Sequence, residues 1–324
     1  MKPFAESNDV LNNPSAVRKR LRDDGYLFLR DVLPRDDVVQ LRRQILEICE
    51  EAGWLRAGAN LMDGLTDRAP IEEGSDAHAA VYKKVQALES FHRLKLHANV
   101  MKIFEDIFEE SVIPFPQTIG RIAFPRDDEN KTQPHQDWIF VGGSTETISC
   151  WAPLGDIPIE VGGLKILEGS HKAGFLEPRA AAGPGHRSVD IDPDLEWVQS
   201  GYRAGDLLLF KMLTIHAAAN NCSPDRLRLS MDFRYTGESH VIGDEWLIPH
   251  SCTTGWEELE SEWRDSPTAH YWERLPKMKI RPHPWWWIRN ILGDRKDRNN
   301  MYVCGLVRWG KGCKRTVFVR APDQ

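Results

Sequence analysis

The sequence predicts a mainly β fold with flanking helices, of the antiparallel sandwich or jelly-roll type. Three observations support this prediction. From residue 112 onward, short apolar runs alternate with clusters of Gly, Pro and Asp, as strands and turns do in such folds. Helical periodicity is concentrated before residue 111 and after residue 240. The 324 residues, 41% of them apolar, suffice for one large domain or at most two.

Composition argues against several classes of protein. No apolar run approaches the roughly 18 residues that a membrane-spanning helix needs, and twelve Trp with twelve Phe are too many for a disordered chain. The net charge of −6 argues against nucleic-acid binding by the whole surface. The six cysteines are widely spaced, and the N-terminal residues show no secretory signal, so we expect a cytoplasmic protein with reduced thiols.

The first region, residues 1–111, is predicted to be helical and to contain one strand. Ser15 can cap a helix that runs to about Asp24 and stops at Gly25, and the apolar residues 26–29 then form the strand. A second helix begins near Pro34. Residues 53–80 are expected to form a loop near a site, and helices follow near 81–97 and 99–109.

The second region, residues 112–240, is predicted to form the β core. A long polar insertion at 171–205 interrupts it. The expected strands are the apolar runs at 117–124, 138–141, 147–154, 163–167, 206–216 and 227–235.

The third region, residues 241–324, is a basic extension that we expect to belong to the same structural domain. From Tyr271 to Gln324, thirteen Lys or Arg accompany only four Asp or Glu. Helical pieces are expected near 257–264 and 284–293, followed by a hairpin at 301–320. The run Trp285–Trp287 favours packing on the core or on a second copy, ahead of contact with an anionic substrate and, last, with a membrane surface.

The tripeptide His135-Gln136-Asp137 is the most informative motif. If it lies on a strand, His135 and Asp137 point to the same face. His216 ends a buried apolar run and can add a second imidazole from a distant strand. Two His and one carboxylate form the facial triad of non-haem Fe(II) sites, which leaves coordination positions open. The alternative is that each fragment is an ordinary turn or strand-end residue.

Several ordered motifs resemble the phytanoyl-CoA dioxygenase-like branch of the Fe(II)/2-oxoglutarate-dependent oxygenases. They cover about residues 20–240: DGYLFLRDVL at 24–33, QPHQDW at 133–138, WAPL at 151–154, GGLKILEGSH at 162–171, GDLLLF at 205–210, HAAANNCS at 216–223 and RLSMDFRY at 228–235. The resemblance implies a double-stranded β-helix (cupin-like jelly roll) core. It also implies that His135, Asp137 and His216 bind the iron.

The same resemblance implies an arginine that binds the far carboxylate of 2-oxoglutarate. Arg226 and Arg228 both fit, and Arg228 is favoured because Arg228-Leu-Ser230 matches a pattern in which the serine also holds this carboxylate. A guanidinium suits the role, since its planar fork binds a carboxylate through two hydrogen bonds. The alternative is that the arginines pair with surface carboxylates. Gln133 can hydrogen-bond the cosubstrate or be an ordinary strand residue.

The resemblance implies an oxidoreductase that uses Fe(II), 2-oxoglutarate and O2, with ascorbate as a stimulant. Because Asp137 is present where halogenating relatives have a small residue, hydroxylation of a small-molecule substrate, one that can be anionic, is the expected reaction. The alternative is a non-catalytic binding protein, or another metal enzyme, on the same jelly-roll scaffold. The identity of the substrate does not follow from the motifs.

Overall fold

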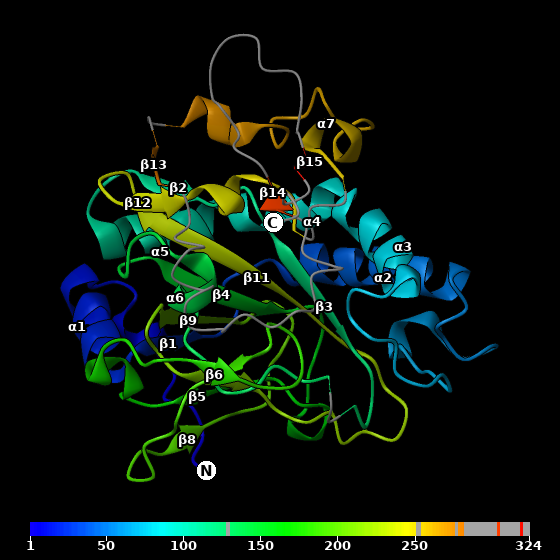
Figure 1. The fold of residues 1–324 in the computed structure, drawn as a ribbon, viewed down its shortest axis with the longest axis horizontal. Helices are drawn as coiled ribbons and strands as arrows, with labels where there is room; N and C mark the ends of the chain where they lie inside the picture. The colour runs from blue at the N-terminus through cyan, green and yellow to red at the C-terminus, as the bar shows by residue number, and fades with distance from the viewer. Residues whose placement is uncertain (128–129, 251–253, 276–277, 282–302, 305–317, 320–324) are drawn as a thin grey trace, which may run out of the picture.

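The structure is a computed structural model that describes residues 1–127, 130–250, 254–275, 278–281, 303–304 and 318–319. Helices lie around a β-rich centre (Figure 1). The α-helices are α1 (Pro14–Asp24), α2 (Arg35–Glu51), α3 (Asp76–Gln86), α4 (Glu89–Arg93), α5 (Ala98–Phe108), α6 (Trp138–Val141) and α7 (Trp256–Leu259). Short 3-10 turns are η1 (Asn8–Val10), η2 (Leu61–Asp63), η3 (Leu94–Leu96), η4 (Ile159–Val161), η5 (Ser170–Ala173), η6 (Asp244–Leu247) and η7 (Tyr271–Arg274).

Two antiparallel sheets form the core of the fold. The larger has the order β1-β9-β4-β11-β2, with β3 also paired to β11. Its strands are β1 (Tyr26–Leu29), β2 (Val112–Pro114), β3 (Ile119–Ala123), β4 (Ile148–Pro153), β9 (Leu207–Lys211) and β11 (Arg228–Gly237). The smaller sheet has the order β10-β5-β8, formed by β5 (Leu164–Leu167), β8 (Trp197–Val198) and β10 (His216–Ala218).

Three two-stranded pairs lie outside these sheets. The pair of β6 (Arg179–Ala180) and β7 (Arg187–Ser188) lies in the 171–205 insertion. In the C-terminal region, β12 (Val241–Gly243) runs parallel to β13 (Lys279–Arg281). The pair of β14 (Val303–Cys304) and β15 (Phe318–Val319) is antiparallel, and it matches the hairpin expected at 301–320.

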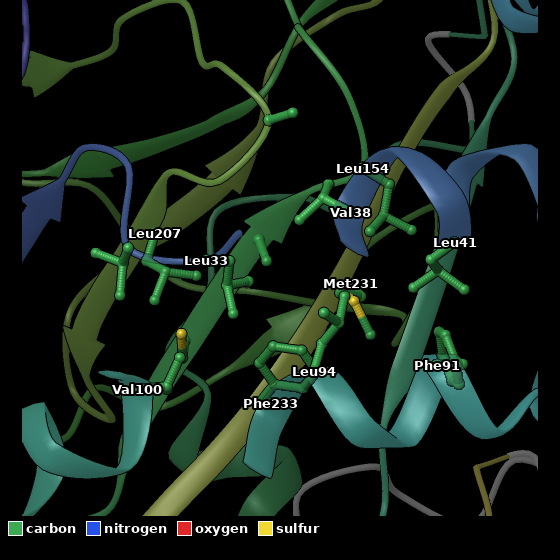
Figure 2. Close-up of a cluster of buried hydrophobic side chains, with 14 of the residues drawn as sticks. Leu33, Val38, Leu41, Phe91, Leu94, Val100, Leu154, Leu207, Met231 and Phe233 are labelled. Carbon is green, nitrogen blue, oxygen red and sulfur yellow. The ribbon is translucent and has the colours of Figure 1, made fainter. Parts of the chain in front are cut away.

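Alternating side chains give the large sheet two buried apolar faces. Phe28, Trp151 and Leu208 pack toward the small sheet, where they meet Ile166. On the opposite face, side chains of the large sheet pack with the helices (Figure 2); this cluster includes Leu41, Phe91, Val100, Leu207, Met231 and Phe233. Burial of each such side chain contributes about 1.5–3 kcal/mol to stability. The jelly-roll architecture predicted from the strand spacing is therefore confirmed, with two facing sheets.

Strand β11 departs from this pattern because one of its faces is polar. Met231 and Phe233 point to the helices, whereas the alternate positions Arg228, Ser230 and Arg234 belong to the other face and are buried. Buried polar side chains are costly unless they have partners. The alternation thus gives β11 one apolar face and one polar face, both buried.

The first helix and strand agree closely with the sequence prediction. Helix α1 ends at Asp24, and Gly25 adopts φ +83° as its C-terminal cap. The prediction of Ser15 as the N-terminal cap is wrong. The side chain of Asn13 caps the helix by accepting a hydrogen bond from the Ala16 amide, and Pro14 is the first helical residue. Strand β1 covers the predicted residues 26–29.

Two strand predictions are wrong. Residues 138–141 form the helical turn α6 instead of a strand. The prediction failed because a short apolar run suits a buried helix as well as a strand. The single strand expected at 206–216 is divided into β9 and β10 by a turn, in which the Thr214 amide donates to the Lys211 carbonyl at 2.9 Å. His216 therefore begins a strand of the small sheet instead of ending one of the large sheet.

The described part of the C-terminal region packs on the core. Trp256, Leu259, Tyr271 and Trp272 form a buried cluster, and the Tyr271 hydroxyl donates to the Phe115 carbonyl at 2.8 Å. Helix α7 lies at the start of the helical piece expected near 257–264. The helix expected near 284–293 and the run Trp285–Trp287 lie outside the described residues.

Candidate metal centre

His135, Asp137 and His216 meet between the two sheets. Two backbone hydrogen bonds join the two histidines, from the His135 amide to the His216 carbonyl at 3.0 Å and from the His216 amide to the His135 carbonyl at 3.1 Å. Asp137 lies two residues on, directly before α6. Its Oδ1 atom is 3.4 Å from the Nε2 atom of each imidazole, and all three side chains are buried.

Backbone carbonyls fix which imidazole nitrogen can act as a ligand. His135 Nδ1 lies 2.7 Å from the Gln133 carbonyl oxygen, and His216 Nδ1 lies 3.0 Å from the Thr214 carbonyl oxygen. Because a carbonyl oxygen only accepts hydrogen bonds, each Nδ1 carries the proton and each Nε2 presents a lone pair. Burial, and then the neighbouring His216, lower the pKa of His135 and keep it neutral.

The second oxygen of Asp137 is held by two protein groups. Oδ2 accepts a short hydrogen bond from the Ser149 hydroxyl and an ion-paired hydrogen bond of 2.8 Å from Arg234 Nη2. Burial by itself would raise the pKa of Asp137, but the charge of Arg234 outweighs it and holds the pKa well below its usual value. Asp137 is therefore an ionised carboxylate with one oxygen directed at the histidines.

These donors fit a non-haem Fe(II) ion. Two neutral imidazoles and one ionised carboxylate are its preferred ligand set, and their ligand atoms all lie within 4.8 Å of one another. Three protein ligands would leave coordination positions of such an ion for other molecules. Among the described residues, this is the one cluster of three or more His, Cys, Asp or Glu side chains with such spacing.

The structure separates the two arginines considered for 2-oxoglutarate. Arg228 is 7% exposed, its Nη1 donates to Ser230 Oγ at 2.8 Å, and its Nε has no hydrogen-bond partner among the described residues. Burial lowers its pKa to about 10, so the guanidinium still carries its charge at neutral pH. Arg226 instead donates to the Asp156 carbonyl at 3.3 Å in an exposed position.

Gln133 takes part in the site through its backbone. Its carbonyl accepts the Nδ1 proton of His135, as described above. Its side-chain amide lies 3.5 Å from the Lys131 carbonyl, which is a weak contact. A side-chain contact with a cosubstrate stays a prediction.

A small cavity of about 60 Å³, open to solvent, lies next to these residues. Arg228 lines it, as does Ala218, which lies two residues after His216 on β10. Glu73 and His78 form another part of the wall, and Arg121 Nη1 contacts Glu73 Oε1 at 2.5 Å. The segment predicted as a loop at 53–80 thus contributes to the wall of the cavity, although it is not all loop, because α3 begins at Asp76 and carries His78.

Sequence reasoning missed Ser149 and the role of Arg234. Arg234 lies in the motif RLSMDFRY at 228–235, which by itself assigns it no function, and no motif contains Ser149. The alternation of β11 places Arg234 on the polar face with Arg228, and that signal was available in the sequence. The contact of Ser149 with Asp137 depends on strand register, which the sequence does not show.

A match to a protein-family profile shows the family to which the chain belongs. The profile of phytanoyl-CoA dioxygenase (PhyH) matches residues 21–229. The chain belongs to the PhyH family. As a member of this family of Fe(II)- and 2-oxoglutarate-dependent oxygenases, it is an oxidoreductase, and the family's cofactors are iron, 2-oxoglutarate and O2.

Individual relatives agree with the PhyH assignment. The chain is 29% identical to 1-deoxypentalenic acid 11-beta-hydroxylase of Streptomyces arenae over 262 residues, covering 76% of this chain and 89% of that protein. It is 25% identical to the peroxisomal phytanoyl-CoA dioxygenase of Rattus norvegicus over 231 residues, covering 67% of this chain and 66% of that protein.

Among solved structures, the epimerase SnoN from nogalamycin biosynthesis is similar in fold. Its TM-score is 0.50 at 20% identity, covering 75% of this chain and 92% of that chain. In the described part of this PhyH member, no helix is long and apolar enough to cross a membrane.

Proposed function

We propose that this chain hydroxylates a C–H bond of a small molecule, with His135, Asp137 and His216 as the three protein ligands of Fe(II). The observation that carries the proposal is the convergence of both Nε2 atoms on Asp137 Oδ1, at 3.4 Å each, while both Nδ1 atoms face backbone carbonyls. The chemistry that Fe(II) supplies when bound is the oxidation of a C–H bond, coupled to the conversion of 2-oxoglutarate and O2 to succinate and CO2.

Arg228 and Ser230 are the proposed binding groups for the far carboxylate of 2-oxoglutarate. The buried guanidinium has an unused Nε donor and no carboxylate partner within hydrogen-bond distance among the described residues. An anion at this point would satisfy the guanidinium, and the low polarisability of the interior strengthens the attraction. Arg226 is not part of this proposal, because its side chain contacts the Asp156 carbonyl. Gln133 is a further candidate for cosubstrate contact.

We also propose that the substrate is a small molecule with an anionic group. Lys131 lines the cavity, and its Nζ contacts the Asn220 side chain at 2.6 Å, with no carboxylate partner among the described residues. The named relatives act on a carboxylic acid and on an acyl-CoA, both of which are anions. Location in the cytoplasm is likewise proposed, from the spacing of the cysteines.

The experiment measures succinate formation by purified protein with Fe(II), 2-oxoglutarate and ascorbate, with and without candidate acids. We expect slow succinate formation without substrate and faster formation with the correct one. His135→Ala and Asp137→Ala should abolish it, because each removes one ligand. His186→Ala is a matched control outside the ligand set and should leave it unchanged. Turnover that survives both ligand substitutions would refute the site.

A further inference from the structure

The two oxygens of Asp137 have different surroundings. Oδ1 faces the imidazoles of His135 and His216, whereas Oδ2 is turned away from them and accepts hydrogen bonds from Arg234 and Ser149. A carboxylate can bind a metal through one oxygen or through both. In this arrangement only Oδ1 is available, because protein donors occupy Oδ2.

The large sheet itself brings the two donors together. Ser149 on β4 lies directly opposite Arg234 on β11 in the antiparallel register. Directly opposite residues have neighbouring side chains on the same face of a sheet. The pairing of β4 with β11 therefore fixes both donors relative to each other before any ligand binds.

Arg234 is held from its other side by the C-terminal region. The carbon at the centre of its guanidinium lies 5.0 Å from the centroid of the Trp246 ring, and Trp246 packs in a cluster with Phe115. Arg234 is only 5% exposed. Its Nε and Nη1 have no hydrogen-bond partner among the described residues, so its one strong polar contact is with Asp137.

We infer that Arg234 and Ser149 are positioning residues that keep Asp137 a one-oxygen ligand of the metal. This inference rests on the proposed function. Without the two donors, the carboxylate could turn and offer both oxygens, which would occupy a position that 2-oxoglutarate or O2 needs. Trp246 supports the arrangement, because its ring limits where the guanidinium can move.

The test uses the purified full-length chain with Co(II) in place of Fe(II), because Co(II) is stable in air and its absorption intensity falls as coordination number rises. We compare Arg234→Met, Arg234→Lys and Ser149→Ala with wild type. The dissociation constant for Co(II) is measured by calorimetry, the Co(II) spectrum is recorded with and without 2-oxoglutarate, and melting temperatures are recorded in parallel.

We expect Arg234→Met to weaken Co(II) binding about 10–100-fold, the usual effect of losing a group that orients a metal ligand. Ser149→Ala, which removes one hydrogen bond to a charged group, should weaken it about tenfold. In both variants the Co(II) spectrum should respond less to 2-oxoglutarate. Arg234→Lys keeps the charge and should recover part of the affinity.

Arg42→Met is the matched control for a merely structural role. Arg42 is also a buried arginine, but it donates to the backbone carbonyls of Leu154 and Met62 instead of to Asp137. We expect it to lower the melting temperature and leave Co(II) affinity unchanged. If Arg234→Met does not fold, Ser149→Ala and Arg234→Lys decide the question.

Two failures can be told apart. Wild-type affinity and an unchanged spectrum in Ser149→Ala and in the folded Arg234 variants would overturn the inference while leaving the proposed function intact. If His135→Ala and His216→Ala bind Co(II) as well as wild type does, the proposed metal centre itself is wrong.

Discussion

Arg226 and Arg228 are two residues apart, yet their guanidinium groups lie in different environments. Arg226 precedes β11, and its exposed side chain contacts the Asp156 carbonyl. Arg228 is the first residue of β11, and its side chain is buried beside Ser230. Residues two apart share a face only within a strand, so the strand boundary between them explains the difference.

This difference predicts unequal effects on 2-oxoglutarate. Arg228→Met removes a buried cation and should raise the KM for 2-oxoglutarate about 100-fold, as expected for the loss of a charged, two-pronged contact. Arg226→Met is the matched control and should leave this KM within a factor of about three, since exposed contacts contribute little. Succinate formation at varied 2-oxoglutarate concentrations measures both. Equal effects of the two substitutions would contradict the assignment.

Two glycines with similar φ angles predict how tightly the cavity wall is packed. Gly162 has φ +70° and ψ 125°, whereas Gly169 has φ +75° and ψ −4°. A Cβ on Gly162 would lie 2.7 Å from the Ala219 carbonyl oxygen and would also collide with the Asn220 carbonyl, whereas a Cβ on Gly169 meets nothing within 4 Å. Asn220 belongs to the wall of the cavity.

Gly169→Ala should therefore cost only the backbone strain, about 1–2 kcal/mol of unfolding free energy. Gly162→Ala should cost more than this and should also raise the KM for 2-oxoglutarate, because the backbone at 219–220 has to move. Urea unfolding measures the first effect and turnover the second. The close approach at Gly162 would be disproved by equal losses of stability in the two variants.

Buried His92 predicts a specific loss of stability in acid. Burial, and then the charge of Lys95, lower its pKa to about 3. Below its unfolded pKa of about 6.5, the unfolded chain binds a proton that the folded chain does not bind, so unfolding becomes more favourable as pH falls. The stability that comes from keeping His92 neutral in the folded chain is fully present above about pH 6.5 and is lost as the pH falls toward about 3.

His92→Gln removes the titrating group and keeps a polar side chain. The stability of wild type relative to this variant should fall by about 1.4 kcal/mol per pH unit between about pH 6 and pH 4. Denaturant unfolding of both proteins over that range is the measurement. A pH-independent difference would show that His92 titrates normally in the folded protein.

Lys95 is a buried lysine whose pKa is lowered well below its usual value by burial, and its loss should destabilise the fold. It is fully buried, and its Nζ donates to the Phe115 carbonyl and to Thr118 Oγ1, both at 2.9 Å, and to the Pro116 carbonyl. Lys95→Met removes the donor to the Pro116 carbonyl and to Thr118 Oγ1, while the Phe115 carbonyl keeps the Tyr271 hydroxyl, and should cost about 2 kcal/mol. Lys102→Met, at an exposed position on α5, should change stability by less than about 0.5 kcal/mol. Thermal unfolding of both variants distinguishes them.

The fold was largely predictable because its strands follow a simple pattern. The run from Arg228 to Tyr235 alternates polar and apolar residues, which defines both the strand and its two faces. Gly25 was recognisable as a helix end because few other residues adopt its conformation. The turn α6 was not predictable, since four apolar residues suit a helix or a strand equally well.

The candidate site was predictable in its ligands but not in its supports. His135 and Asp137 are neighbours in sequence, and His216 followed from the order of the motifs. The contacts of Ser149 and Arg234 with Asp137 depend on which residues of β4 and β11 face each other. The register between β4 and β11 is set by the whole sheet, and no local sequence pattern predicts it.

The pair of main-chain hydrogen bonds between His135 and His216 has a consequence for how new specificities can arise in this scaffold. Peptide groups set the separation of the two histidine backbones, and Phe140 and Phe210 pack against the imidazole rings. Ile71, Glu73 and Pro184 line the cavity outside both sheets, so substitutions there can adapt the cavity to other molecules while the spacing of the two histidine backbones stays the same.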